Sequence, residues 1–522
     1  MGKGFIAKFE DVYKLTYWRC IMNLKKYFLM SLPVLGASLI AGDIYVNSSF
    51  NGVSTGSKAA PFTTIQAAAN VAQQGDTIWL YGSDEVSYVF ETDVSAVVFN
   101  PDNLHLRGYT DDGEATDWYE TNKMAKVFIP DGYAKNSFEE DQKTDRPFTV
   151  NGANMKISGV YFDFGGKSFK QQNYGGDNLI VVTNTNFCVE NSYFYMSSTA
   201  GYSASSTPIS GIDIDKSPSR DMVFNRCAFV YTDCYRDYNT PITCCDGLLT
   251  AKNCYFELAN RFATGLNKVR TSICVVSNIF YNCLSSGQKE NESYVAALFS
   301  RGGNYYPVNA EITYNRIIRD DYDSKWGTMP YYLLVHGGMY GGSFTQDVKI
   351  HHNTIVGADR AFITRRRLKG NEDTDVWAPE IHNNIILLSE GGELIREYEG
   401  SVPGQKFYND YTTSYKLGSF IRNNALMYDT FLTGDATTNS WYKLEYEEGA
   451  DCGVVIQDNF DLTGIPKFVN TTDPTNKDFY RLRLDDNQWV RQNAWRGENN
   501  EYPRYIGALE PLLPLASLII LK

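Results

Sequence analysis

An asparagine recurs at eight places along this chain, each time between two short apolar runs, and this repeat constrains the fold more than any other feature. The residues three before and two after the asparagine are almost all apolar or aromatic. Successive asparagines lie about 25 to 40 residues apart, which is an interval typical of solenoid repeats. Gly159 takes the same place in MKISGVYF. The eight asparagines are Asn191, Asn225, Asn253, Asn278, Asn315, Asn353, Asn384 and Asn424.

A short β-run, a turn asparagine, a second β-run and a variable excursion describe one coil of a parallel β-solenoid. Asparagine suits the turn because it tolerates left-handed backbone angles and forms local hydrogen bonds. Stacked coils would place equivalent asparagines above one another as a ladder, and their inward side chains would form one continuous core. A helical repeat is disfavoured, because the runs are rich in Val, Ile, Tyr and Phe and do not follow helical spacing.

Three of the five histidines lie beside the later asparagines. His351 and His382 both precede an asparagine by two residues, Arg422 takes that position one coil later, and His352 follows His351 directly. A strand spacing of about 4.8 Å would bring the rings of His351 and His382 together. They could form a metal site or a stacked or solvent-facing pair. We expect the latter, because no third ligand stands in the same position.

The segment 44 to 83, IYVNSSFNGVSTGSKAAPFTTIQAAANVAQQGDTIWLYGS, predicts a strand, a Gly/Ser loop, an amphipathic helix and a second strand. Thr63 or Thr64 can cap a helix near 65 to 73, and Gly75 ends it. Such a helix would cover the open end of a strand stack, where unpaired backbone groups would otherwise invite aggregation.

This opening resembles that of secreted proteins of the pectin-lyase-like superfamily, and the closing segments IPKFVNTTDPTNKDFYRLRLDD and EYPRYIGALEP resemble their closing segments. The resemblance covers roughly residues 43 to 510. It implies an all-β fold, a right-handed parallel β-helix (solenoid) with an N-terminal capping helix. We expect a leader and signal peptide over 1–42, a capping segment over 43–100, coils over 101–460 and a closing segment over 461–522.

The start of the chain predicts export. MNLKKYFLMSLPVLGASLIAG, from Met22 to Gly42, has the basic start, apolar middle and small final residues of a signal peptide. The alternative is an N-terminal membrane anchor, although this apolar run is short for a span and no later segment is long enough. We therefore expect a secreted or cell-surface protein, with the periplasm as an alternative, and a monomer without a membrane span after signal cleavage.

The composition limits the partners and the cysteine chemistry. A net charge of −13 argues against a nucleic acid as partner. Eight of the ten cysteines lie between Cys188 and Cys283, and the absence of a CxxC pair argues against zinc. They are expected to be buried small residues, with disulfides, for example from Cys244 and Cys245, as the alternative.

Members of the superfamily with known activity act mostly on carbohydrates. The sequence lacks the set of strings that polygalacturonase-like hydrolases carry, whereas chondroitinase-B-like and alginate-lyase-like enzymes place a lysine on one coil and an LRHG arginine on the next. The segments GLNKVRTSICVVSN and ALFSRGGNYY resemble this arrangement in part. The resemblance implies Lys268 as the base and Arg301 as the clamp on the substrate carboxylate, with Arg270 as a substrate contact, in β-elimination of an acidic polysaccharide.

Two further groups are candidates for binding. Asp213 and Asp215 alternate in GIDIDK, so both would face one side of a strand and could hold calcium for a uronate; a solvated edge strand is the alternative. Arg365, Arg366 and Arg367 form the strongest basic cluster and could grip an acidic glycan or pair with nearby acids. The alternative function is a non-catalytic cell-surface or adhesive β-helix that binds glycans.

Overall fold

A computed structural model describes most of the chain from residue 41 onward. The described residues are 41–83, 87–89, 97–128, 148–163, 177–197, 206–211, 221–232, 241–244, 247–257, 263–265, 271–283, 307–319, 332–336, 345–365, 376–398, 419–427, 430–433, 454–484 and 486–512. The predicted signal peptide lies outside the described residues, apart from Ala41 and Gly42.

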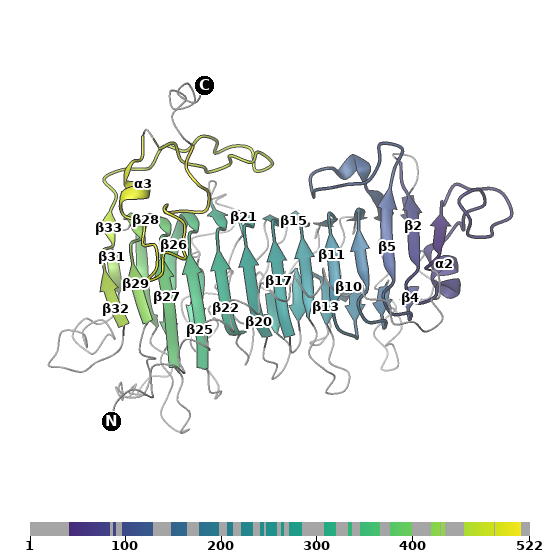
Figure 1. Ribbon diagram of the computed structural model, residues 1–522, viewed down its shortest axis with the longest axis horizontal. Coiled ribbons are helices and arrows are strands. Elements are labelled where there is room, and N and C mark those ends of the chain that lie inside the picture. The colour runs from purple at the N-terminus through teal and green to yellow at the C-terminus, as the bar shows by residue number, and fades with distance from the viewer. Residues whose placement is uncertain are drawn as a thin grey trace. The chain divides into compact units, whose positions relative to one another are not determined.

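Three sheets of parallel strands make up the body of the protein (Figure 1). The first sheet contains β1 (Asp43–Val46), β2 (Thr77–Tyr81), β5 (His105–Tyr109), β8 (Lys156–Ser158), β11 (Phe187–Glu190), β14 (Met222–Asn225), β17 (Gly247–Lys252), β20 (Thr271–Val276), β22 (Pro307–Thr313), β25 (Thr345–His351), β27 (Val376–His382), β29 (Ser419–Arg422) and β32 (Val454–Gln457).

The second sheet contains β3 (Ser87–Val89), β6 (Ala125–Phe128), β9 (Val160–Asp163), β12 (Tyr193–Ser197), β15 (Ala228–Thr232), β18 (Tyr255–Glu257), β21 (Ile279–Tyr281), β23 (Arg316–Ile318), β26 (Thr354–Arg365), β28 (Ile385–Tyr398), β30 (Ala425–Met427) and β33 (Phe460–Asp461), with β24 (Tyr332–His336) on β26 and β31 (Thr430–Thr433) on β28. The third contains β4 (Val97–Phe99), β7 (Phe148–Val150), β10 (Asp177–Val182), β13 (Ser206–Gly211), β16 (Ile242–Cys244) and β19 (Ala263–Gly265).

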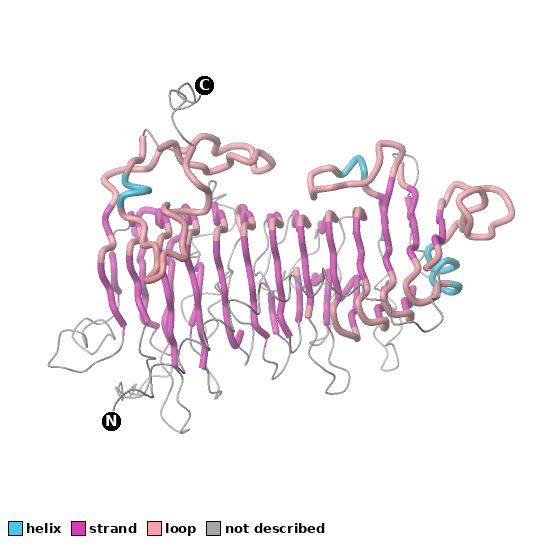
Figure 2. Tube along the Cα trace, in the orientation of Figure 1, coloured by secondary structure: helices cyan, strands magenta, loops and turns pink. Residues whose placement is uncertain are grey.

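The chain visits the sheets in turn, so each circuit is one coil. For example, β11, β12 and β13 belong to the first, second and third sheets, and β14 returns to the first sheet beside β11. Figure 2 shows the strands of successive coils side by side along the body. Every pairing between these strands is parallel, and equivalent residues of successive coils are in register except at shifts in the β20–β22 and β26–β28 pairs. The all-β parallel β-helix predicted from the sequence is confirmed, and right-handed crossovers are the rule for parallel strands joined in this way.

A constant corner joins each first-sheet strand to the second sheet from β8 to β32. The residue after the strand has a positive φ, and the next residue turns its side chain into the corner. The left-handed residues are Gly159, Asn191, Arg226, Asn253, Ser277, Tyr314, His352, Asn383, Asn423 and Asp458. Because left-handed angles are costly for most side chains, this position explains why glycine and asparagine recur there.

The position after the left-handed residue carries a buried ladder. The Asn353 backbone N–H donates to Oδ1 of Asn384 on the next coil at 2.9 Å, and its side-chain Nδ2 donates to the same oxygen at 2.9 Å. Nδ2 of Asn353 also donates to the Ile312 carbonyl of the preceding coil at 2.8 Å. The same pattern joins Asn278, Asn315, Asn353, Asn384, Asn424 and Asn459.

The predicted ladder is therefore correct for five of the eight asparagines and wrong for three. Asn191 and Asn253 occupy the left-handed position, and Asn225 ends strand β14 one residue earlier. In those coils, Ser192, Cys227 and Cys254 fill the ladder position, and the Cys227 N–H donates to Cys254 Sγ at 3.5 Å.

Inward side chains form the core along the coils. Phe162, Phe194, Phe229, Phe256 and Phe280 stack in one column, with neighbouring ring centroids 4.7 to 5.2 Å apart. Their spacing follows the strand spacing, so each coil completes the burial of its neighbour. Five described cysteines are free thiols, and three of them, Cys227, Cys254 and Cys283, are buried as expected.

The predicted capping helix is α2 (Ile65–Val71). Thr64 caps it, because its hydroxyl accepts a hydrogen bond from the Ala67 N–H at 3.2 Å. Ile65, Ala68 and Ala69 face the core against the first coil. Within the described residues, no helix is long and apolar enough to cross a membrane.

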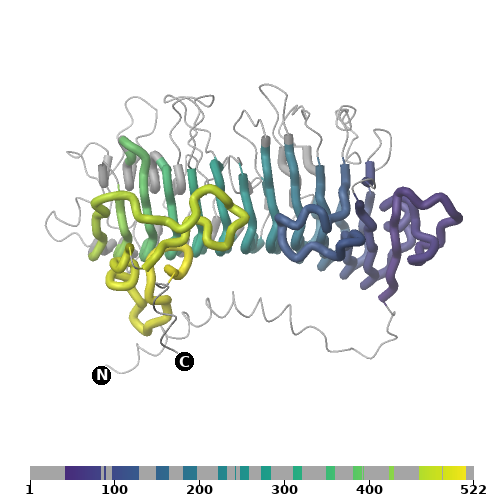
Figure 3. Tube along the Cα trace, turned by 90° about the horizontal axis from the view of Figure 1, so that it is seen from above, coloured from purple at the N-terminus to yellow at the C-terminus, as the bar shows by residue number. Residues whose placement is uncertain are grey.

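Two segments lie outside the coils, over different ends of the β-helix (Figure 3). Loop 110–124, which contains the 3-10 helix η1 (Thr121–Lys123), follows β5, and its Trp118 stacks on Tyr255 of β18 with ring centroids 4.6 Å apart. The C-terminal segment 466–512, which contains the short helix α3 (Trp489–Gln492), packs on the later coils. Asn383 fixes this segment, because it donates to the Trp495 carbonyl at 2.6 Å and accepts from the Trp495 N–H at 2.8 Å.

Of the two arrangements expected for the histidine column, the stacked pair is confirmed and the solvent-facing one is not. The rings of His351 and His382 stack 4.8 Å apart, and His352 Nδ1 lies 2.9 Å from His351 Nδ1. All three side chains are buried, because Tyr502 and Trp495 of the C-terminal segment cover them. The cover comes from more than a hundred residues further along the chain, so the local pattern could not reveal it.

Candidate functional site: a polar depression beneath loop 110–124

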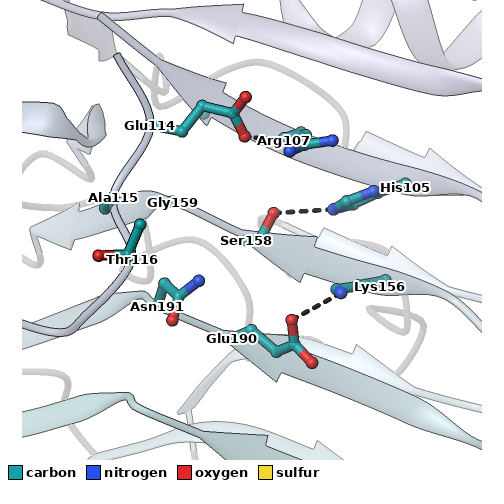
Figure 4. Close-up of a pocket in the computed structure, with 11 residues that line it drawn as sticks. His105, Arg107, Glu114, Ala115, Thr116, Lys156, Ser158, Gly159, Glu190 and Asn191 are labelled. Carbon is teal, nitrogen blue, oxygen red and sulfur yellow. Dashed lines mark hydrogen bonds and ion pairs between the residues drawn. The ribbon is translucent and has the colours of Figure 1, made fainter. Parts of the chain in front are cut away.

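A depression of about 330 Å³ opens on the outer face of the first sheet, beneath loop 110–124 (Figure 4). Strands β5, β8 and β11 form its floor, and Glu114, Ala115 and Thr116 form its rim. The polar floor residues are His105, Arg107, Lys156, Ser158 and Glu190, with Asn191 at the corner.

Strand alternation explains why these side chains share one face. In β5, Leu106 points into the core, so His105 and Arg107 point outward. In β8, Ile157 points inward between Lys156 and Ser158. The register His105↔Lys156 and Arg107↔Ser158 then sets the four outward side chains on adjacent strands.

A histidine and a serine form the centre of the depression. His105 Nε2 and Ser158 Oγ are 2.8 Å apart, and Ser158 is almost fully buried. Burial, together with the charges of Lys156 and Arg107, lowers the pKa of His105 to about 3. His105 is therefore neutral at physiological pH and is a weak proton acceptor, which suits it to hydrogen bonding with a ligand rather than to general-base catalysis.

Two ion pairs flank the histidine and serine. Lys156 Nζ lies 2.6 Å from Glu190 Oε2 on the next coil. Arg107 pairs through Nε with Glu114 of the rim, and its guanidinium carbon lies 4.7 Å from the centroid of the Trp79 ring. Each cation has a carboxylate partner, so an anionic ligand would have to displace Glu114 or Glu190. The rim glutamate is the more easily displaced of the two, because it lies on a loop rather than on a strand.

The depression therefore offers hydroxyl, imidazole, guanidinium and ammonium groups over a few ångströms of sheet. These groups match the hydroxyls and carboxylates of a saccharide. The sequence carries a signal for the site, the alternation in HLR and KIS, but it does not reveal that loop 110–124 folds over these strands.

Almost all of the site residues predicted from the sequence lie outside the described residues. Lys268, Arg270 and Arg301 lie outside the described residues, as do Asp213 and Asp215. Arg366 and Arg367 also lie outside them, and Arg365 is the last residue of β26, where the structure describes only the backbone. Of the described residues, no three or more His, Cys, Asp or Glu side chains group in a way that could hold a metal ion.

No protein-family model matches the sequence, and no curated protein matches it. The chain is similar to a solved pectate lyase, with a TM-score of 0.47 and 12% identity over 90% of this chain and 96% of that chain. A rhamnogalacturonan lyase gives a TM-score of 0.44 and 11% identity over 85% and 97%. A PL6 family polysaccharide lyase from Pseudopedobacter saltans gives 0.38 and 12% over 80% and 95%. The parallel β-helix itself rests on this chain's own strand registers.

Proposed function

We propose that this protein is exported and cleaves an acidic polysaccharide by β-elimination at uronate residues. Lys268 would take the proton beside the uronate carboxylate, Arg301 would neutralise that carboxylate, and Arg270 would contact the substrate. This step needs a cation to stabilise the developing charge and a base to accept the proton.

The observation that carries the proposal is the order of the strands around these residues. Lys268 and Arg270 belong to the five residues between β19 and β20, and Arg301 belongs to the segment between β21 and β22. Strands β20 and β22 are paired neighbours in the first sheet, so the two segments belong to successive coils. Successive coils are about 4.8 Å apart, which is a suitable spacing for a base and a carboxylate clamp on one sugar.

Further contacts would come from Arg365, Arg366 and Arg367 and from the depression around His105. Asp213 and Asp215 would hold calcium if the reaction needs it, since paired carboxylates on one strand face supply oxygen ligands. Export rests on the signal-peptide pattern from Met22 to Gly42.

An ultraviolet absorbance assay for unsaturated uronates tests the proposal, with polygalacturonate, alginate and chondroitin sulfate as substrates and with calcium or a chelator. We expect product from at least one of them, and a loss of about 100-fold or more in kcat for Lys268→Ala. Lys477→Ala is the matched control, because it removes an exposed lysine far along the chain, and it should leave kcat unchanged. No product from any substrate would overturn the proposed cleavage.

The depression favours a second candidate function, a non-catalytic glycan-binding protein. Its histidine is neutral and its cations are paired, so it has groups for binding but none prepared for proton transfer. Binding of a glycan without product formation would support this alternative.

A further inference from the structure

The corner between the first and second sheets has an open stretch between the two outer segments. On the N-terminal side, Trp118 of loop 110–124 covers Tyr255, and on the C-terminal side His352 and Asn383 contact Tyr505 and Trp495 of the segment 466–512. Figures 1 and 3 both show the two segments separated above the middle strands. Arg226 and Lys252 lie on neighbouring coils beside Trp118, which stacks on Tyr255 of the Lys252 coil, and both side chains are exposed.

Arg226 is an unusual occupant of the corner. Its φ is +52°, whereas glycine and asparagine fill half of the described left-handed positions. Arginine gains nothing locally from a left-handed backbone, and the conformation costs about 1 kcal/mol or more for a residue with a Cβ. Strained residues of this kind cluster at functional sites, and Arg226 is the one cation among the ten described left-handed corner residues, which calls for a role beyond the turn itself.

Lys252 brings a second cation beside the first. It pairs with Asn225 in the register of β14 and β17, and its carbonyl accepts the Arg226 N–H at 3.0 Å, so the two basic residues belong to adjacent coils. Neither side chain forms a salt bridge with any carboxylate that the structure describes. Asp117 of loop 110–124 is close enough for the charge of Arg226 to act on it: burial raises the pKa of Asp117, and Arg226 opposes that rise.

Two amides complete the surface. Asn253 Nδ2 donates to Asn225 Oδ1 at 3.4 Å, and both side chains are partly exposed. This bond leaves the Asn225 amide nitrogen and the Asn253 amide oxygen without another described partner. The surface thus combines a planar guanidinium, an ammonium group, an amide donor and an amide acceptor on two neighbouring coils.

We propose that Arg226, Lys252, Asn225 and Asn253 form a binding site for the carboxylates and hydroxyls of a uronate glycan. Arginine binds a carboxylate through two parallel hydrogen bonds, lysine adds a second charge, and the amides match sugar hydroxyls. The ligand class rests on the proposed function. The coil of Lys252 continues through β18 and β19 to the segment that contains Lys268, so a chain bound here would lie on the coil that carries the proposed base.

The test measures binding by calorimetry in a Lys268→Ala background, which prevents turnover. The probes are a galacturonate hexasaccharide, a heparin hexasaccharide and neutral cellohexaose. The site variant is Arg226→Gly with Lys252→Gln, in which glycine removes the charge and also fits the left-handed backbone, so folding is retained. The control is Arg483→Gln with Lys477→Gln, two exposed cations of the C-terminal segment with the same total charge change.

We expect the Kd for the galacturonate hexasaccharide to rise about tenfold or more in the site variant, and to stay unchanged in the control. Added salt should weaken binding by the parent protein more than by the site variant. Equal affinities of the site variant and the control would overturn the site, and a preference for cellohexaose would overturn the uronate ligand. A preference for heparin, which carries sulfates as well as uronates, would overturn the carboxylate as the group that selects the ligand. If the intact protein forms no unsaturated product while the affinity difference holds, the proposed cleavage fails and the binding site stands.

Discussion

Replacing Asn353 of the ladder by alanine should destabilise the β-helix far more than replacing Asn253, which occupies the left-handed corner position before the ladder position. Asn353 is fully buried, and its Oδ1 accepts from both the backbone N–H and the side-chain Nδ2 of Asn315, at 2.9 and 3.0 Å. Its Nδ2 donates to the Ile312 carbonyl and to Asn384 Oδ1. Alanine would remove these bonds and leave the Asn315 N–H buried without its acceptor.

The magnitude follows from these contacts. A buried donor without a partner costs about 1 to 3 kcal/mol, and each remaining hydrogen bond contributes about 1 kcal/mol net. Because some partners keep a second bond, such as Asn315 Nδ2 to the Val275 carbonyl at 2.9 Å, we expect a total loss of about 3 to 5 kcal/mol. Asn353→Asp keeps the shape but cannot donate to Asn384 Oδ1, so it should cost at least as much.

The matched control is Asn253, which occupies the left-handed position and is partly exposed. Asn253→Gly should be close to neutral, and Asn253→Ala should cost about 1 kcal/mol because alanine resists a positive φ. Equilibrium unfolding in urea, followed by circular dichroism, measures these differences. If Asn353→Ala costs no more than Asn253→Ala, the ladder does not stabilise the fold in the way argued above.

Three other expectations follow from particular contacts. Burial lowers the pKa of His352 to about 3, and burial also lowers the pKa of His351 and His382, so the stability that these neutral rings contribute is complete above about pH 6.5 and is lost as the pH falls toward 3. Limited proteolysis of the C-terminal segment should therefore accelerate near pH 5, and His352→Asn should reduce this effect; a rate independent of pH would contradict it. Trp118→Ala should remove about 3 kcal/mol of packing free energy from loop 110–124 and make the loop sensitive to protease. An unchanged cleavage rate would mean that the stack on Tyr255 does not hold the loop. Thr64→Ala should lower the unfolding free energy by about 1 kcal/mol through loss of the α2 cap, as measured by calorimetry. An unchanged unfolding free energy would mean that the cap does not stabilise the protein.

The sequence predicted the architecture well, because a parallel β-helix repeats its local chemistry on every coil. The strand–corner–strand pattern around Asn315 is visible without any tertiary information, and so is the cap at Thr64. The prediction that equivalent asparagines form the ladder failed at Asn191, Asn225 and Asn253. On those coils a serine or cysteine holds the ladder position, and the asparagine lies one or two residues earlier in the sequence.

The surface could not be predicted in the same way. The depression around His105 depends on loop 110–124 folding back over three strands, and the burial of His382 depends on Trp495. Both are contacts between segments with no common local pattern, and nothing in the spacing of HLR or IHNN encodes them. Arg226 is the partial exception, because its place in the repeat is readable once the corner is known.

The corner is only one or two residues long at ten successive coils, whereas the stretch between a second-sheet strand and the next first-sheet strand varies widely in length. Insertions and deletions can therefore accumulate in that stretch without disturbing the stacking of the neighbouring coils. A lineage of such proteins could exchange one outer loop at a time, and with it the ligand, while inheriting the same interior.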